Sequence, residues 1–490
     1  MNEVLGSFIA LLTVYVLTGS LIAYLSRRYG IKSSKDYFVS GYRLGWFLTA
    51  MTYAATTYSA FMMVGLVGLT YSSGAGALGF ELAYLLVTVV ILASIGPDVW
   101  AMARERGWVS PSEMLSDLYD SRALGYLAVG VYLIAMIPYV SAQIIGAATI
   151  FEGIGLGYEA GVVVITLLIL MWIVLAGMWS VATTDAYQGV WMLSAAAVLV
   201  FLLTYHLLPA SGATLTQLTE ALSGKGLLGL TDFWTPQTFL AYTLPWIFFA
   251  VTNPQVVIRL YVPKDRVSYK RSVLLFSLFG FTYTLAVVYI GLVVRGLTEL
   301  NLFESVSKAD LVTSKLLSGF NPVLSSFIHI SIIAAAVSTA NSIVLAVASS
   351  FVRDLIEKRR WLNVNIFHVS NVMVTLLTII SSLLAFMRVG FVVDLSVLTS
   401  VLLLPLAPVT VVAWVAPHTV KGRPQRIAAL TAVAVGFAMS FALAATLGPR
   451  RTFLTTYYGL PISALVLITS TIVFLAGIIT SRRGKVKERS

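Results

Sequence analysis

The chain has 490 residues, of which 58% are hydrophobic and only 11% are charged. A soluble protein of this length needs roughly twice that fraction of charged residues to cover its surface. Cysteine is absent, which excludes disulfides, thiolate metal sites and cysteine catalysis. The net charge of +11 could indicate a nucleic-acid partner, but the basic residues lie in short loops between apolar segments, so their placement is better tested as a membrane orientation.

Apolar segments of about twenty residues recur along the whole length, and each can cross a hydrocarbon core of roughly 30 Å. The first follows an acidic terminus, so we expect a retained span and not a cleaved signal peptide. The sequence predicts an all-α membrane protein with one domain, 1–490. Its thirteen predicted transmembrane helices cover residues 4–25, 46–71, 78–97, 123–151, 160–178, 187–208, 238–258, 272–295, 322–351, 366–387, 391–415, 427–447 and 456–480.

The distribution of Lys and Arg predicts the orientation, because cytoplasmic loops carry an excess of both. Placing the C-terminus inside assigns 25 of the 32 basic residues to the cytoplasmic side and leaves 7 outside. Since thirteen is odd, the N-terminus is then outside. We expect a multi-pass protein of the plasma membrane. The residues counted as cytoplasmic include Arg259, the cluster Lys358, Arg359 and Arg360, and the tail from Arg482 to Arg489.

Two predicted spans are interrupted near mid-membrane. The second contains the small and polar run Tyr53–Ala60, and the seventh contains Thr252–Gln255, in which Pro254 removes a backbone donor. Freed carbonyls at this depth are tolerated only where they line a cavity or bind something. The two breaks lie five spans apart, which is typical of an inverted-repeat transporter. The predicted repeats cover about 46–208 and 238–415, with peripheral helices at 4–25, 427–447 and 456–480.

Four blocks of sequence, in register along nearly the whole chain, carry a resemblance to the sodium/solute symporter family, in particular to its proline/pantothenate-type prokaryotic members. The resemblance implies a five-plus-five-helix inverted-repeat fold of the LeuT type and sodium-coupled symport. The blocks are Asp36–Trp46 with Ala54–Ala60 and Gly65–Gly68, Gly177–Gln188, Ala334–Asn341 with Arg353–Leu355, and Asn253-Pro254 with Arg259.

The resemblance also implies a sodium site between the second and ninth spans. Its ligands would be the carbonyls of Ala55, Tyr58 and Ala335 and the hydroxyls of Ser338 and Thr339. The spacing suits the role, because residues three and four apart share one helix face and a hard cation is held by about five oxygens. The alternative is that these small and hydroxylated residues only permit close helix packing.

Asp185 and Glu81 are acidic residues between or within the apolar spans, and we consider both as functional candidates. We expect Asp185 in a loop between the fifth and sixth spans. The resemblance places it on the ion release path toward the cytoplasm, whereas the residues alone also fit an N-cap for the sixth span. Glu81 lies about one turn inside the outer end of the third span. A membrane carboxylate is a candidate functional residue, but we expect this one at the interface.

Six residues match positions that line the solute cavity in the family: Thr57, Ser59, Trp246, Ala250, Asn253 and Pro254. The proline carriers have aspartate at Thr57, tyrosine at Ala250 and Gln-Pro at Asn253-Pro254, so proline itself is a poor candidate for the cargo. Trp246 could equally be an ordinary apolar anchor.

The predicted function is sodium-coupled uptake of a small organic solute by alternating access. The solute would be an amino acid or a carboxylate (proline-like, a monocarboxylate or pantothenate-like), because a half-helix N-terminus offers free N–H groups. The alternatives are a passive channel and a proton-coupled carrier of the same fold. An enzyme is not expected, and neither are a cofactor, a nucleic-acid partner or an obligatory protein partner. The histidines, which we interpret as structural, are His206, His329, His368 and His418.

Overall fold

The computed structural model describes residues 2–357 and 365–487. Nearly all of this length is helical, as an apolar chain in a bilayer must be, because helices satisfy their own backbone hydrogen bonds. Lys358, Arg359, Arg360 and Arg489, counted above as cytoplasmic, lie outside the described residues.

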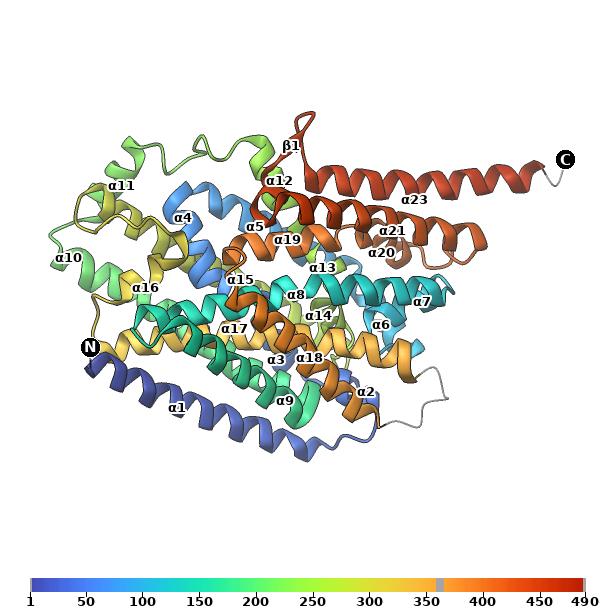
Figure 1. The fold of residues 1–490 in the computed structure, drawn as a ribbon, viewed down its shortest axis with the longest axis horizontal. Coiled ribbons are helices and arrows are strands. Elements are labelled where there is room, and N and C mark those ends of the chain that lie inside the picture. Colours follow the sequence, from blue (N-terminus) through green and yellow to red (C-terminus); the bar gives the residue numbers. More distant parts are fainter. Residues whose placement is uncertain (1, 358–364, 488–490) are drawn as a thin grey trace.

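The helices follow one another with short connections (Figure 1). The main helices are α1 (Asn2–Leu25), α3 (Trp46–Thr57), α4 (Val67–Ser73), α5 (Gly76–Ser94), α6 (Gly96–Arg106), α7 (Pro111–Leu118), α8 (Arg122–Gly153), α9 (Tyr158–Leu202), α12 (Pro236–Ile247), α15 (Arg266–Glu299), α17 (Pro322–Phe351), α18 (Ile366–Phe386), α19 (Val392–Leu403), α20 (Leu406–Val415), α21 (Arg423–Leu447) and α23 (Ile462–Lys487).

Shorter elements complete the chain. The short α-helices are α2 (Ser34–Val39), α10 (Leu208–Ala210), α11 (Leu215–Gly224), α13 (Phe249–Thr252), α14 (Pro254–Val257), α16 (Val312–Leu317) and α22 (Pro449–Leu454). The 3₁₀ turns are η1 (Ser26–Tyr29), η2 (Ser40–Tyr42), η5 (Ile258–Leu260) and η6 (Ala309–Leu311). The π-helical turns are η3 (Phe61–Leu66), η4 (Leu203–Leu207) and η7 (Val352–Ile356). An antiparallel pair, β1 (Thr456–Tyr457) and β2 (Leu460–Pro461), precedes α23, so the last span begins six residues later than predicted.

Within the described residues, nine helices are long and apolar enough to cross a membrane, or eleven if each of two bent pairs is one span. The multi-spanning helical prediction is confirmed. The two remaining predicted spans correspond to the shorter apolar helix Tyr158–Ile173 and to 238–258, which is divided among α12, α13 and α14. The total of thirteen stays a prediction.

The connection between the fifth and sixth predicted spans is helical, contrary to the loop that we expected. Helical residues continue through α9, and the direction of the chain changes at Gly177, whose φ is +54°. A side chain there would meet the Tyr37 carbonyl oxygen at 2.5 Å. Glycine is therefore required both by the left-handed backbone and by the close approach of the α2 segment.

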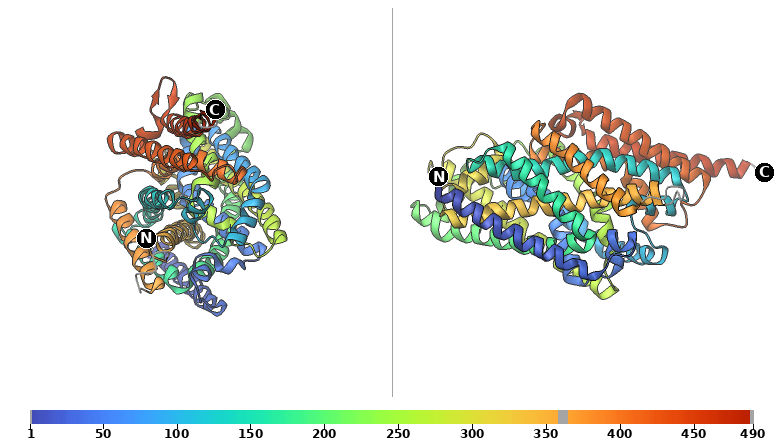
Figure 2. Two further views of the ribbon diagram at one scale, coloured as in Figure 1. Left: turned by 90° about the vertical axis from the view of Figure 1, so that its right-hand side faces the viewer. Right: turned by 60° about the horizontal axis from the view of Figure 1, so that its bottom comes forward.

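The central element is α17, which runs through the middle of the bundle (Figure 1). Its most apolar stretch is entirely buried, and it packs against α8, α9, α1 and α3. Figure 2 shows the bundle end-on, with α17 enclosed by its neighbours. The small residues of 334–340 allow these neighbours to approach closely.

Two further features of the bundle concern its ends and bends. The start of α1 and the end of α23 lie at opposite ends of the bundle (Figure 1), as an odd number of spans requires. The pair α19 and α20 bends by 58° at the Leu404-Pro405 junction. This break was missed, although Pro405 inside an apolar run is a signal for it.

Candidate functional site

The predicted break in the second span is present. Helix α3 ends at Thr57, Tyr58 has an extended conformation (φ −92°, ψ 90°), and the chain resumes at a 46° angle in η3 and α4. The amide of Tyr58 still donates to Ala54, but the next amides leave the helical ladder. The carbonyls of Ala55 and Thr56 are therefore available for other partners.

Side chains occupy the donors on the far side of this break. The Ala60 amide donates to Gln143 Oε1 (3.2 Å), and the Phe61 amide donates to Ser59 Oγ (3.1 Å). The half-helix N-terminus thus has fewer free N–H groups for a solute carboxylate than we expected. Gln143, fully buried on α8, was not among the predicted site residues. A lone amide in an otherwise apolar span was the signal for it.

The freed carbonyls face hydroxyls of α17. Ser338 Oγ donates to the Ala55 carbonyl (2.9 Å) and also lies 3.0 Å from the Ala335 carbonyl. Thr339 Oγ1 lies 3.1 Å from the Ala55 carbonyl and 3.3 Å from that of Thr56. Four of the five predicted sodium ligands therefore converge.

The fifth predicted ligand is Tyr58, at the break itself and 1% exposed. The oxygens gathered here are hard carbonyl and hydroxyl donors, which suit Na⁺. The same hydrogen bonds also serve the alternative of helix packing through hydroxyls. The donor set fits sodium, and the assignment stays a prediction.

Asp185 is buried inside α9 and is neither in a loop nor at a helix N-terminus, so both of those expectations were wrong. Its Oδ2 accepts a hydrogen bond from Thr52 Oγ1 (2.6 Å) and lies 3.4 Å from Ser342 Oγ. The same oxygen lies 3.6 Å from Arg259 Nη2. The carboxylate thus lies between α3 and α17, about one helical turn from the predicted sodium ligands along both helices.

Arg259 is the partner that the sequence analysis missed. It is 1% exposed in the helical turn η5, so it does not lie in a solvated loop as we expected. Nη2 donates to Ser342 Oγ (2.5 Å), Nε donates to Thr52 Oγ1 (3.3 Å) and Nη1 donates to the Gln255 carbonyl (2.9 Å). A buried ion pair is tolerated only when such additional hydrogen bonds satisfy both charges.

The predicted break in the seventh span is also present. Asn253 is extended (φ −83°, ψ 118°) between α13 and α14, and its carbonyl accepts the amides of Val256 and Val257. Pro254 has no amide to donate to the Ala250 carbonyl. The side chains here bond to one another: Asn253 Nδ2 lies 3.3 Å from Thr252 Oγ1, and Gln255 Nε2 lies 3.4 Å from Asn253 Oδ1.

Trp246 lies in an aromatic cluster that spans the two breaks. Its ring stacks on Phe249 (centroids 5.2 Å apart) and lies 5.3 Å from Phe61, which follows the first break. Tyr84 of α5 contacts the same indole at 5.6 Å. This packing fits an ordinary apolar anchor as well as a solute contact, so the role of Trp246 toward a solute stays a prediction.

The other predicted solute residues are buried close to the two breaks. Thr57 ends α3 with a hydroxyl that has no hydrogen-bond partner among the described residues, and Ser59 is held by its contact with the Phe61 amide. Ala250 and Asn253 are completely buried. The six predicted solute residues thus lie at or near the two breaks, which the contact between Phe61 and Trp246 joins, and their role in a solute site stays a prediction.

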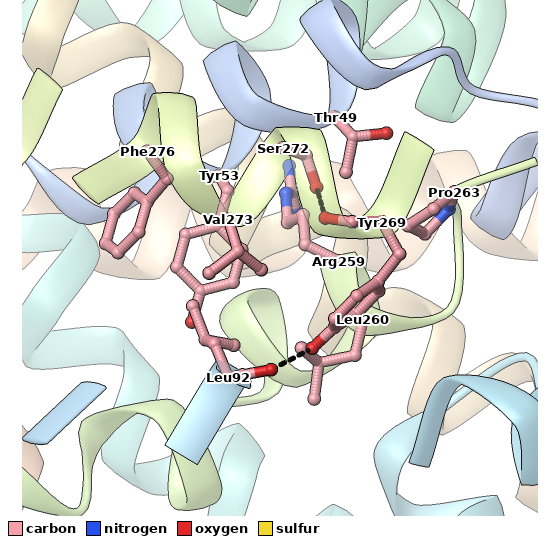
Figure 3. Close-up of a pocket in the computed structure, with 10 residues that line it drawn as sticks. All are labelled: Thr49, Tyr53, Leu92, Arg259, Leu260, Pro263, Tyr269, Ser272, Val273 and Phe276. Atoms are coloured by element: carbon pink, nitrogen blue, oxygen red, sulfur yellow. Dashed lines mark hydrogen bonds between the residues drawn. The ribbon is translucent and has the colours of Figure 1, made fainter. Parts of the chain in front are cut away.

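A small cavity lies on the α15 side of this junction (Figure 3). Arg259 lines it together with Tyr53, and Tyr269 closes it by donating to the Leu92 carbonyl (2.8 Å). None of the predicted solute residues lines this cavity, but Arg259 links it to the Asp185 ion pair. The lining residues are Thr49, Tyr53, Leu92, Arg259, Leu260, Pro263, Tyr269, Ser272, Val273 and Phe276.

A second, larger hollow lies at the opposite end of the bundle, between α4, α12 and α19. Asp310, Asp394 and Arg450 contribute charged groups to its wall. The Asp310 carboxylate accepts the Val392 amide (3.2 Å) at the start of α19, and burial raises the pKa of this carboxyl to about 6. The hollow is on the predicted outer side, where a solute would enter.

The chain is similar in sequence to a known family and to known transport proteins. The model of the sodium:solute symporter family matches residues 37–419. A sodium/pantothenate symporter of Haemophilus influenzae is 23% identical over 347 residues, 70% of each chain. A sodium/proline symporter of Staphylococcus aureus is 23% identical over 363 residues, 70% of this chain and 67% of that protein.

Solved structures share the fold. A Na⁺-coupled sialic acid symporter in a substrate-bound outward-open state aligns over 97% of this chain and 98% of its own, with a TM-score of 0.80 and 18% identity. A nucleobase-cation-symport-1 family transporter aligns over 92% of this chain and 95% of its own (TM-score 0.59, 14% identity). An Eremococcus coleocola manganese transporter aligns over 92% and 97% (TM-score 0.54, 14% identity). These likenesses confirm the transporter fold of the LeuT type.

Proposed function

The chain belongs to the sodium:solute symporter family, and we propose that it couples Na⁺ entry to uptake of an amino acid or a small carboxylate. It is a multi-pass membrane protein and a transporter, not an enzyme. The convergence of Ser338 and Thr339 on the Ala55 carbonyl carries the proposal, because it gathers hard oxygens at the broken span.

The mechanism follows from what the site connects. Sodium bound to the carbonyls of Ala55, Tyr58 and Ala335 and the hydroxyls of Ser338 and Thr339 holds α3 against α17. That arrangement fixes the first break, and with it the Phe61 side of the aromatic cluster around Trp246. One repeat, about 46–208, then rocks against the other, about 238–415, and exposes the bound sodium and solute to the cytoplasm.

Asp185 provides the exit for the ion. Its second carboxylate oxygen, Oδ1, has no hydrogen-bond partner among the described residues, and the carboxylate touches both helices of the sodium site. A cation that leaves the Ser338 and Thr339 hydroxyls meets this oxygen next. Arg259 neutralises the carboxylate while no ion passes.

The driving force is sufficient for accumulation. One charge that moves down about 100 mV releases about 2.3 kcal/mol. A tenfold sodium gradient adds about 1.4 kcal/mol. Together they support roughly several-hundred-fold accumulation of a neutral solute.

The cargo class is supported by the relatives and by the cluster around Trp246, Ala250 and Asn253. The named cargos of the relatives are pantothenate and proline. The occupied amides of Ala60 and Phe61 reduce the support that the half-helix terminus gives to a carboxylate.

Uptake by proteoliposomes tests the function. An inward sodium gradient should drive saturable uptake of at least one amino acid, monocarboxylate or pantothenate-like acid, and an equal potassium gradient should not. Flux that ignores the sodium gradient and does not saturate would indicate a passive channel. Uptake driven by a proton gradient without sodium would indicate the proton-coupled alternative.

We also propose a plasma-membrane location with the N-terminus outside and the C-terminus in the cytoplasm. The absence of native cysteine makes this testable with single substitutions. Ser318 and Lys421 are both exposed, and the proposed orientation puts Ser318 outside and Lys421 in the cytoplasm. Ser318→Cys should therefore react with an impermeant thiol reagent on intact cells, and Lys421→Cys should react only after permeabilisation. The reverse pattern would invert the topology.

A further inference from the structure

A buried carboxylate borders the proposed solute site, and no basic side chain of the described residues forms an ion pair with it. Glu81 of α5 is 2% exposed, so it faces the interior of the bundle, and its expected depth at the interface stays a prediction. Its Oε2 has no hydrogen-bond partner in the part of the chain that the structure describes. An ionised carboxylate in a dry interior costs several kcal/mol unless it is paired. The group is therefore either protonated or balanced by a cation that is not among the described side chains.

The residues around Glu81 connect it to both helix breaks. The carboxylate lies close enough to interact electrostatically with the phenols of Tyr58, Tyr84 and Tyr139. Tyr58 is the residue at the first break, and its hydroxyl rests on α15, where a Cβ on Gly280 would meet it at 2.1 Å. Tyr139 of α8 contacts the ring of Phe249, which begins α13. Glu81 thus faces the junction that holds the predicted solute residues.

An aromatic wall adjoins the carboxylate. Trp246 is flanked by Phe249, Phe61, Phe80 and Tyr84, with ring centroids between 5.2 and 6.3 Å from its own. Trp246 Nε1 and the Tyr84 hydroxyl, both buried, have no hydrogen-bond partner among the described residues. Buried polar groups without partners point to a ligand or to water. Aromatic faces beside a carboxylate are the chemistry that recognises an organic cation.

We propose that Glu81 and this aromatic wall bind an ammonium group of the solute. The inference rests on the proposed function and narrows it: the cargo carries an amine, as an amino acid does, and is not a simple monocarboxylate or a pantothenate-like acid. The Glu81 carboxylate balances the positive charge, and the Tyr84 hydroxyl accepts a hydrogen bond from the ammonium. The Trp246 indole N–H, which only donates, bonds to an acceptor on the remainder of the solute, which extends toward Ser59 and Asn253.

Matched pairs of probes that differ only at the amine test this assignment. The pairs are L-alanine and L-lactate, L-leucine and L-2-hydroxyisocaproate, and L-proline and tetrahydrofuran-2-carboxylate, with choline and putrescine as cations that lack a carboxylate. Sodium-dependent thermal stabilisation of the purified protein and uptake by proteoliposomes are measured for each. We expect at least one amine-bearing probe to bind about tenfold or more tightly than its counterpart.

Two variants separate recognition from folding. Glu81→Gln keeps the size of the side chain and removes its charge, so it should abolish the preference for the amine. Thr88→Val is the matched control, because Thr88 lies two turns along the same helix, is also buried and also has an unpartnered hydroxyl. It should keep the preference. If Glu81→Gln is unstable, Glu81→Asp, which retains the charge, should retain the preference at reduced affinity.

The outcomes distinguish this inference from the proposed function. Sodium-driven uptake of a hydroxy acid in preference to its amine partner would leave the symporter function intact and overturn the role of Glu81. An unchanged amine preference in Glu81→Gln would overturn it as well, and so would a panel in which no amine-bearing probe binds. If Glu81→Gln removes only a dependence on the proton gradient, Glu81 carries a coupled proton and the ammonium assignment is wrong.

Discussion

The two broken spans solve the same local problem in different ways. At the first break, the carbonyls of Ala55 and Thr56 leave the helical ladder and meet hydroxyls from α17, a helix nearly 300 residues away in sequence. At the second break, the carbonyl of Asn253 is used at once by the next turn, and the side chains bond to their own neighbours. Free carbonyls suit a cation, whereas a self-satisfied break beside aromatic rings suits an organic solute.

The buried ion pair joins the two breaks. Arg259 follows the second break, Asp185 lies on α9, and Thr52 and Ser342 link both to the helices of the first. A change at either break is therefore transmitted through charges that cannot be left unpaired. This contact is how we expect sodium binding and solute binding to influence one another.

The largest expected effect is the loss of the sodium response when the hydroxyls that face the first break are removed. Replacing both hydroxyls, Ser338→Ala with Thr339→Ala, removes two ligands, each worth about 1.5–3 kcal/mol toward a charged group. Sodium should then no longer stabilise the purified protein or drive uptake, measured by thermal unfolding and proteoliposome flux. Ser331→Ala is the control, because its hydroxyl bonds only within α17 to the Ile328 carbonyl. A sodium response unaltered by the Thr339 substitution would place the ion elsewhere.

The next effect tests the link between the breaks. Asp185→Ala leaves Arg259 buried without its partner and should destabilise the protein by about 3–5 kcal/mol. Asp185→Ala combined with Arg259→Met should be less destabilised than the first variant alone, since neither charge remains. The two temperatures of unfolding are compared in the same detergent. Additive losses would show that the pair is not coupled.

A smaller effect concerns the donors at the first break. Gln143→Met removes the acceptor of the Ala60 amide, and an unsatisfied buried amide costs about 1–3 kcal/mol. We expect a lower temperature of unfolding and a weaker sodium response, because this contact satisfies the first amide beyond Ser59 at the break that carries the sodium ligands. Gln143→Glu, which keeps an acceptor at this position, should preserve more of both. Equal behaviour of the two variants would remove Gln143 from the site.

The smallest effect belongs to the second break. Trp246→Phe keeps an aromatic ring but loses part of the stack with Phe249, which is worth about 0.5–1.5 kcal/mol. The half-saturating concentration of the solute should rise by up to roughly tenfold. The sodium concentration that stabilises the protein without solute should stay the same. A change in sodium affinity of the same size would mean that the two breaks are not specialised as described.

The sequence by itself determined the features that depend on local chemistry. Apolar length predicted the spans, because a bilayer demands helices of about twenty residues. The run Tyr53–Ala60 and the pair Asn253-Pro254 predicted both breaks, because small polar residues and proline weaken a helix wherever they stand. The i, i+3, i+4 spacing placed Ala335, Ser338 and Thr339 on one face, and the structure turns that face toward Ala55.

Only the tertiary structure decided which long-range partners those features meet. Arg259 reads as one more cytoplasmic arginine until the chain folds it against Asp185, and Gln143 reads as a stray amide until α8 brings it to Ala60. Asp185 looked like a loop or cap residue because it lies between two apolar runs. In the structure the chain changes direction earlier, at Gly177, so that Asp185 lies inside α9. The close contact between Gly177 and Tyr37 is not visible in any local pattern. Glu81 looked interfacial from its position along the span. Its burial depends on which way α5 faces, and that is set by packing against α12 and α15.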